Sequence, residues 1–503
     1  MDNRSTKQIT GGAIISYLAI GVNVLIGLIY TPWMIQTIGS SNYGLYTLAI
    51  SVINVFAVDF GLSSATTRFV AKQVAENNEQ GVRNILGIIA KLYLLVSAAI
   101  FCVLVAIYPF LGSIYKGLTA EEFQAFKIVY LIVASYSIIS FPFVSLNGIF
   151  SAYEEFVAMK LCDLFQRVGS VLFIVVILLL GGDLYALVTV NALCGIVTIL
   201  VKLGVLRKKH GLEINWKYKN RSLLKEIFSF SIWTTVVSIC TRLIFNLVPS
   251  ILGMVSNSQA IAQYGVASTI DGYFYTFAAA LGSLFLTRVM RLLYGNAKDK
   301  DALNKLAVQV GRIQLVIISL LYMGFVAIGK EFITLWMGKE YEITYYCILF
   351  LSFPDIIEYA QQIPNSAITA ANKIKSQAKA YMLTAAISVI VTFIGAKIAG
   401  SFGASVAICI ACICRTVTMC YLYVKELDFD LAGFFKKTYP SIIPVLVGMM
   451  VFSLALNKYW TVSSWIELLG KGLIVVLVYM ALTIAFFLNN DERKTLMSKI
   501  ARR

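Results

Sequence analysis

Fourteen apolar stretches, each long enough to cross a lipid bilayer as a helix, occupy most of this 503-residue chain. A membrane-spanning helix needs about 20 predominantly apolar residues, because each residue advances it by about 1.5 Å. Within lipid the backbone must satisfy its own hydrogen bonds, which favours helices. We therefore predict an all-α polytopic membrane protein with about 14 transmembrane helices. They lie near residues 10–35, 43–66, 86–111, 124–148, 163–182, 184–205, 226–253, 261–287, 308–329, 344–366, 377–398, 402–424, 438–457 and 465–488.

The composition leads to the same class of protein. Apolar residues make up 59% of the chain and charged residues only 14%. Soluble domains have about 45–50% and about 25% respectively. A soluble fold could not bury this much apolar surface, so the chain must expose it to lipid.

Lysine and arginine concentrate on one side of the predicted spans. Of the 42 Lys and Arg residues, 33 lie in the tails, the even-numbered loops and the adjoining helix ends, and seven lie in the other loops. Arg242 and Arg415 lie within spans. Because basic loops stay in the cytoplasm, both termini are predicted to be cytoplasmic. This placement explains the net charge of +16 without nucleic acid as a partner.

Two six-helix blocks of the sequence resemble each other. In the first, Tyr43-Gly44 opens a helix that ends at Arg68, and in the second Tyr264-Gly265 opens one that ends at Arg288. An even number of helices per block means that both copies cross the membrane in the same direction. The sequence thus predicts an N-terminal lobe at residues 1–210, a C-terminal lobe at 211–425, and two further helices with a cytoplasmic tail at 426–503.

Charged residues inside the spans are the candidate functional residues, because burying a charge in lipid costs at least a few kcal/mol unless it faces a cavity or a partner. In helix seven, Arg242 shares one face with Ser238 and Asn246, and in helix ten Asp355 shares a face with Glu358. Both faces are expected to line a water-filled lumen. The full set is Asp59, Arg242, Asp271, Asp355, Glu358 and Arg415, with Arg68 and Arg288 at the cytoplasmic helix ends.

The arginines suggest a site for an anionic headgroup. Guanidinium groups bind phosphate bidentately and keep their charge, so we expect Arg242 and Arg415, helped by Arg68 and Arg288, to hold it. The structural alternative is an ion pair, such as Arg242 with Asp271, or helix-end arginines that only reach the interface. The acidic residues are candidates for coupling to H⁺ or Na⁺, or for neutralising the arginines.

Two sequence motifs that would indicate nucleotide or metal binding are incomplete. Residues 324–330 read G-x-x-x-x-G-K, but Glu331 follows where a P-loop needs Ser or Thr. Three cysteines at 409, 412 and 414 have no nearby histidine, since His210 is the only histidine of the chain. No ATPase, metal site or cofactor is predicted.

The N-terminal motifs resemble those of a known family. Pro32, the stretch Ile38-Gly39-Ser40-Ser41-Asn42-Tyr43-Gly44-Leu45-Tyr46, Asp59-Phe60-Gly61-Leu62 and Arg68-Phe69-Val70-Ala71 resemble the opening of bacterial polysaccharide exporters. These are Wzx-type flippases, a branch of the multidrug/oligosaccharidyl-lipid/polysaccharide (MOP) exporter superfamily. The motifs cover about the first 75 residues; the remainder agrees in helix count, length and repeat.

The resemblance implies a MATE-like fold with two six-helix lobes and a cationic cavity in the bacterial inner membrane. It implies flipping of an undecaprenyl-pyrophosphate-linked oligosaccharide repeat unit of O-antigen, capsule or exopolysaccharide, with membrane lipids and other polysaccharide-assembly proteins as partners. Arg242 and Arg415 match the family's cavity arginines only as residue type in corresponding helices.

Three alternatives stay open. A multidrug or cation antiporter of the same superfamily commonly has an acidic residue in helix one, and this chain has none between Asp2 and Asp59. A peptidoglycan-precursor flippase shares the helix count and the cationic cavity. A membrane polysaccharide polymerase or glycosyltransferase would need a larger outer loop than this sequence offers, so we expect a transporter and not an enzyme.

Overall fold

The structure, a computed structural model, describes residues 3–56, 59, 61–294, 300–371 and 373–488. The side chains of residues 3–14, 16–17, 228–231, 279–288, 290–291, 293–294 and 300 lie outside the described part. Contacts divide the chain into two compact units, Met1–Ala262 and Gln263–Arg503. The predicted three-part division at residues 210 and 425 stays a prediction.

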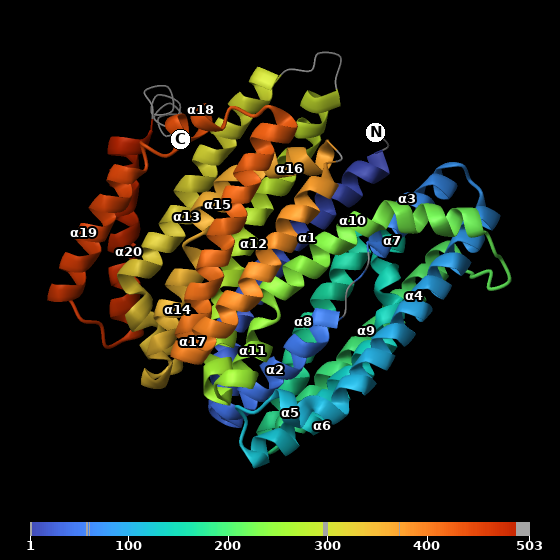
Figure 1. Cartoon of the computed structure of the whole chain (residues 1–503), viewed down its shortest axis with the longest axis horizontal. Helices are drawn as coiled ribbons and strands as arrows, with labels where there is room; N and C mark the ends of the chain where they lie inside the picture. The colour runs from blue at the N-terminus through green and yellow to red at the C-terminus, as the bar shows by residue number, and fades with distance from the viewer. Residues whose placement is uncertain (1–2, 57–58, 60, 295–299, 372, 489–503) are drawn as a thin grey trace. The chain divides into compact units, whose positions relative to one another are not determined.

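Unit 1 is built from helices throughout its described residues (Figure 1). Within it α8 packs on α1 and α9, α6 packs on α2 and α9, and α3 packs on α4 and α7. Its elements are α1 (Asn3–Ile38), α2 (Ser40–Phe56), α3 (Leu62–Ala75), α4 (Glu79–Ile107), η1 (Tyr108–Phe110), α5 (Leu111–Ile114), α6 (Ala120–Ser140), η2 (Phe141–Val144), α7 (Ser145–Ala152), α8 (Phe156–Leu179), α9 (Leu184–His210), α10 (Arg221–Phe245), α11 (Val248–Val255) and the first residues of α12 (Ser258–Tyr294).

Unit 2 is likewise helical, and its long helix α13 contacts most of the others, including α14, α16, α18, α19 and α20 (Figure 1). Its elements are the remainder of α12, α13 (Lys300–Met337), η3 (Lys339–Tyr341), α14 (Glu342–Ser352), α15 (Asp355–Glu358), η4 (Tyr359–Gln361), α16 (Gln362–Ala370), α17 (Ile374–Leu427), α18 (Leu431–Thr438), α19 (Ile443–Tyr459), α20 (Trp465–Leu482) and η5 (Thr483–Phe487).

Among the described residues, eight helices are long and apolar enough to cross a membrane, or ten if each of two bent pairs forms one span. Within the described residues, each of the fourteen predicted spans falls on helical segments. The predicted helices eleven and twelve are the two arms of α17, and helices two and ten are divided into α2–α3 and α14–α16. The predicted all-α architecture is thereby confirmed for the described residues.

Glycines close the two tight turns that the sequence predicts between spans. After α8, Gly181 has a φ of 85°, and the Asp183 carboxylate then caps α9 by accepting a hydrogen bond from the amide of Ala186. Within α17 the chain reverses at Gly400, whose φ is 54°. A Cβ on Gly395 would lie 2.3 Å from the carbonyl oxygen of Gly403, so only glycines let the two arms approach this closely.

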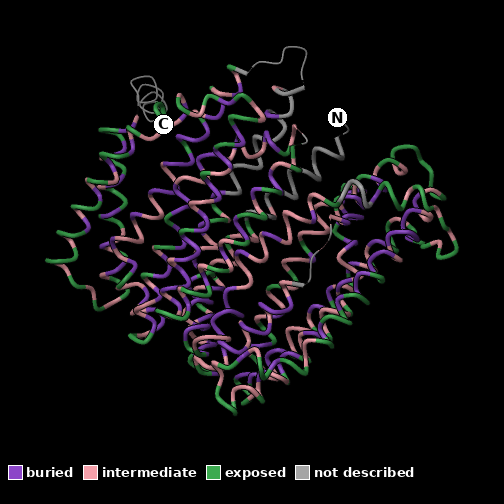
Figure 2. Tube along the Cα trace, viewed as in Figure 1, coloured by how far each residue is buried: buried purple, intermediate pink, exposed green. Residues whose placement is uncertain are grey.

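Exposed apolar side chains cover the outer helices. Ile466 is 83% exposed, Leu469 73% and Leu454 66%. Figure 2 shows exposed positions along α19 and buried positions along the inner helices of unit 2. In water such a surface would associate, whereas in a bilayer it contacts acyl chains, as expected of a multi-pass membrane protein.

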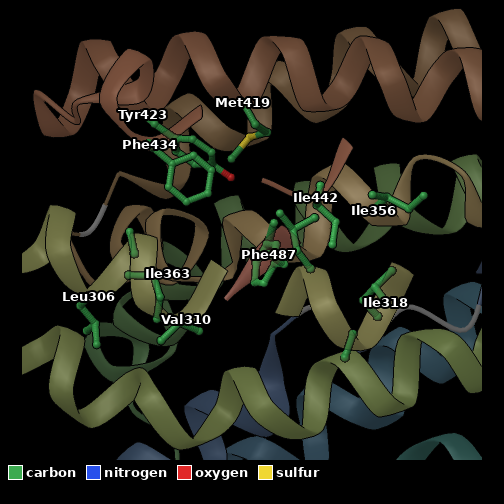
Figure 3. Close-up of a cluster of buried hydrophobic side chains, with 14 of the residues drawn as sticks. Leu306, Val310, Ile318, Ile356, Ile363, Met419, Tyr423, Phe434, Ile442 and Phe487 are labelled. Atoms are coloured by element: carbon green, nitrogen blue, oxygen red, sulfur yellow. The ribbon is translucent and has the colours of Figure 1, made fainter. Parts of the chain in front are cut away.

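The core of unit 2 joins α13 to the C-terminal helices. Leu306, Val310 and Ile318 of α13 belong to the same buried cluster as Phe434 and Phe487 (Figure 3). The cluster also includes residues of α15–α17, α19 and α20. Burial of apolar side chains contributes about 1.5–3 kcal/mol per large residue in water, and inside lipid close packing replaces this term.

Polar contacts fasten α20 and the η5 turn to α13 at three levels. The Lys471 ammonium is fully buried and donates to Glu331 Oε1 (2.6 Å) and to the Trp460 carbonyl (3.0 Å). Farther along, the Tyr479 hydroxyl bonds to Ser319 Oγ (2.7 Å). At the other end the buried Arg312 donates to the Phe487 carbonyl (2.7 Å). These three contacts hold α20 along most of its length.

Candidate functional site

Arg415 is the centre of a polar cluster in unit 2. It lies in the second arm of α17, and its side chain is only 7% exposed. Its guanidinium forms an ion pair with the Glu358 carboxylate, which the break between α14 and α16 brings into the unit. It also lies 5.6 Å from the ring centre of Tyr381. The structure thus joins two residues that the sequence predicted only as separate candidates.

Two further carboxylates belong to this cluster. Asp355 interacts electrostatically with Asp271, Glu358 and Arg415. Asp271 Oδ1 and Asp355 Oδ2 are both buried and have no hydrogen-bond partner in the described structure. A buried carboxylate oxygen without a partner costs about 1–3 kcal/mol or more. Only Glu358 pairs with the guanidinium, so the unpartnered oxygens of Asp271 and Asp355 can each take up a proton.

The space beside Arg415 is small. A cavity of about 10 Å³ is lined by Arg415, Glu358, Tyr381 and five neighbouring residues. That volume is at the lower limit for one water molecule. An anionic group could reach the guanidinium only if the cavity widened and Arg415 left Glu358.

Arg242 and Asp59 lie within electrostatic range of each other in unit 1. Arg242 Nη1 donates to the Asn54 carbonyl (2.5 Å), and Asp59 accepts from the Tyr93 hydroxyl (2.5 Å) and the Ser63 amide (3.1 Å). Asp59 therefore holds the break between α2 and α3 against α4. Of the predicted polar stripe on α10, Ser238 is half-buried, and Asn246 follows the helix and accepts from Ser51 through its carbonyl.

The two helix-end arginines differ in what the structure describes. Arg68 is exposed in α3 and lines a polar cavity described below. Arg288 lies in α12, and its side chain is outside the described part. The lumen role predicted for all ten candidate residues stays a prediction.

Sequence reasoning missed two cations of unit 1. Arg167 lies near the middle of α8, about 16 Å along the axis from Phe156, and interacts electrostatically with Tyr30 and Tyr46. Tyr46 lines a cavity of about 170 Å³. Lys202 is buried in α9 and donates to Asp163 (2.7 Å) and Asn147 (3.0 Å). Both residues lie inside predicted spans but were counted among the helix-end charges. For Arg167 the reason is that α8 starts seven residues before the apolar run predicted for it.

Solved structures share this fold. The inward closed conformation of the lipid II flippase MurJ matches with a TM-score of 0.70 at 15% identity, over 95% of this chain and 98% of that chain. An inward-facing multidrug resistance MATE transporter of the MOP superfamily matches with a TM-score of 0.66 at 15% identity, over 85% and 99%. The first is described as a flippase and the second as a transporter, and at 15% identity the likeness shows the shared fold.

Sequence comparison assigns the family. The uncharacterized membrane protein EpsK of Bacillus subtilis (strain 168) is 22% identical over 494 residues, 95% of each chain. The family model described as "Polysaccharide biosynthesis protein" matches residues 9–286, which is more than half of the chain. This multi-pass membrane protein, with the fold of the MOP exporters, therefore belongs to the polysaccharide biosynthesis protein family.

Proposed function

We propose that the protein moves an undecaprenyl-pyrophosphate-linked oligosaccharide repeat unit from the cytoplasmic to the outer leaflet of the bacterial inner membrane. The observation that carries this proposal is the presence of arginines deep within helices of a polysaccharide-family membrane protein. Arg167, Arg242 and Arg415 lie in α8, α10 and α17. Membrane interiors exclude such charges unless they have a partner or a task, and a pyrophosphate headgroup needs cations to cross.

The proposed cycle is alternating access between lobes that repeat in parallel. The sugar and pyrophosphate travel through the lumen while the polyprenyl tail stays in lipid. Membrane lipids are therefore direct partners, and other polysaccharide-assembly proteins supply and receive the glycan. Both termini remain in the cytoplasm, as the loop charges predict.

Energy coupling is proposed at the acidic cluster of unit 2. The ion pair between Arg415 and Glu358 neutralises one of three carboxylates. When a phosphate attracts Arg415 away from Glu358, the released carboxylate gains affinity for H⁺ or Na⁺. The anionic substrate would then pair with Arg415, and the H⁺ or Na⁺ would bind Glu358 in place of Arg415.

Cells that lack the protein are expected to accumulate one oligosaccharide on polyprenyl pyrophosphate in the cytoplasmic leaflet, because later assembly steps act outside. Extraction of these lipids, mass spectrometry and a membrane-impermeant label for leaflet position would measure it. The wild-type gene should relieve the accumulation. No accumulation, together with new sensitivity to cationic drugs, would favour a multidrug or cation antiporter.

A second candidate function is transport of the peptidoglycan precursor, which the likeness to the lipid II flippase favours. The same extraction separates the two. Accumulated lipid II, with no other lipid-linked glycan, would support the second candidate and contradict the first.

Substitution of Arg242 tests its part in transport. Arg242→Ala is expected to slow transport by roughly tenfold or more, whereas Arg242→Lys keeps the charge and loses less. Transfer of a labelled lipid-linked glycan from one leaflet of reconstituted vesicles to the other measures both rates. Wild-type transport in the alanine variant at equal membrane abundance would remove Arg242 from the site.

A further inference from the structure

A polar cavity of about 510 Å³ opens in unit 1 between α3, α4, the start of α10 and the segment at residues 211–220. Its volume lies within the range of about 300–1,000 Å³ that small-molecule sites occupy. Its lining residues belong to the loops between the predicted spans two and three and between the predicted spans six and seven. The charge pattern predicts that both loops are cytoplasmic. Transport through the lumen does not by itself require such a cavity.

Specific contacts hold the 211–220 segment against α4. The Asn215 amide nitrogen donates to the Arg83 carbonyl (3.0 Å), and its side chain donates to Asn84 Oδ1 (2.7 Å). Lys91 Nζ donates to the Tyr218 carbonyl (2.8 Å). A Cβ on Gly87 would lie 2.0 Å from the Asn215 carbonyl oxygen, so the close approach depends on this glycine. The cavity wall is therefore preformed.

Carboxamide side chains make up much of the lining. Asn78 accepts from the Gly81 amide (2.9 Å) and donates to Gln73 Oε1 (2.8 Å), while Gln80 and Asn84 line the wall beyond them. Each carboxamide has two N–H donors and an oxygen with two lone pairs. The bonds within the wall leave donors and acceptors for a ligand with many hydroxyl groups.

Charged and aromatic groups complete the lining. Arg68 and Lys72 provide positive charge, and Glu226 provides a carboxylate that accepts hydroxyl hydrogens. Phe69 and Tyr218 add apolar ring surface. Arginine and lysine bind phosphate oxygens, whereas amides, a carboxylate and ring faces suit a sugar. The combination fits a glycosyl diphosphate better than a bare phosphate or an apolar ligand.

We propose that this cavity is a cytoplasmic receiving site that binds the glycosyl diphosphate head of the lipid-linked glycan before it enters the lumen. The inference rests on the proposed transport function and gives Arg68 a role outside the lumen. Nucleotide sugars contain the same chemical group, so the test must separate the lipid-linked source from the soluble one.

The test uses the full-length protein in lipid nanodiscs. The probes are undecaprenyl-pyrophosphate-linked glycan extracted from producing cells, UDP-glucose, and the free glycan without phosphate. Arg68→Ala and Lys72→Ala are each expected to weaken binding of the lipid-linked glycan by roughly tenfold. Gln80→Ala should weaken it less. The matched control is Lys208→Ala, an exposed cation of α9 that does not line the cavity, which should bind within about twofold of wild type.

Transport in vesicles provides the second measurement. The Arg68→Ala and Lys72→Ala variants should each raise KM by roughly tenfold with kcat retained, because Arg242 and Arg415 are intact. The proposed receiving site would be overturned by an unchanged Kd and KM in a variant that carries both Arg68→Ala and Lys72→Ala. Tighter binding of UDP-glucose than of the lipid-linked glycan would overturn it as well. Absence of glycan transport by the wild-type protein would instead refute the proposed function itself, so the two failures are distinguishable.

Discussion

Replacing Arg415 with alanine is expected to lower glycan transport by at least about 100-fold, the largest functional effect among the predicted residues. The substitution removes the cation that pairs with Glu358 and interacts with Asp355, and leaves a buried Asp355 beside a half-buried Asp271 and Glu358 without it. Arg415→Lys keeps a charge but loses the planar fork, so an intermediate loss of roughly tenfold is expected. Flipping of labelled lipid-linked glycan in reconstituted vesicles measures both.

The control must separate substrate binding from support of the fold, because removal of one member of a buried ion pair commonly costs about 3–5 kcal/mol of stability. Glu358→Gln alone and combined with Arg415→Ala completes a double-mutant cycle. The unfolding temperature should return toward the wild-type value in the double variant, whereas the transport rate should stay low. Recovery of transport with stability would assign Arg415 a structural role only.

Replacing Lys471 with methionine is expected to produce the largest loss of stability, about 3–5 kcal/mol. The change leaves the Glu331 carboxylate without its ammonium partner at a site where Lys471 is fully buried. It also removes the hydrogen bond to the Trp460 carbonyl. Unfolding of the purified protein in detergent, followed by circular dichroism at rising temperature, measures the effect.

A double variant and a matched control variant test whether burial of the ion pair causes that loss of stability. Lys471→Met with Glu331→Leu removes both charges and should regain most of the lost stability, since apolar pairs replace buried ion pairs at little cost. Lys458→Ala removes an exposed cation of the neighbouring helix α19 and should change stability by less than about 0.5 kcal/mol. Equal loss in the Lys458 variant would contradict the assignment of the effect to burial.

Much of the helical fold could be predicted from the sequence, because lipid imposes one length and one kind of secondary structure on every span. The apolar runs located the helices, and glycines located the reversals at Gly181 and Gly400. Helix ends were less predictable. Polar residues such as those at the start of α8 continue a helix beyond the apolar run, so Arg167 was counted as a helix-end charge although it lies about halfway along the helix.

The candidate site was predictable as a set of residue types and not as a set of contacts. Periodicity placed Asp355 and Glu358 on one face, but the pairing of Glu358 with Arg415 joins residues 57 positions apart. Likewise, one donor to Asp59 is the Tyr93 hydroxyl, which a hydropathy pattern treats as part of an apolar run. Tertiary packing chooses such partners, and a single sequence does not reveal it.

The three contacts that fasten α20 and η5 to α13 also limit where an isoprenoid chain can lie. Lys471 and Phe487 are separated by roughly 24 Å of helix, close to the thickness of the hydrocarbon core. With Tyr479 bonded between them, the seam between α13 and α20 is closed near both of its ends and in its middle. Under the proposed function, a polyprenyl tail would therefore pass along flanks of unit 2 other than the seam between α13 and α20.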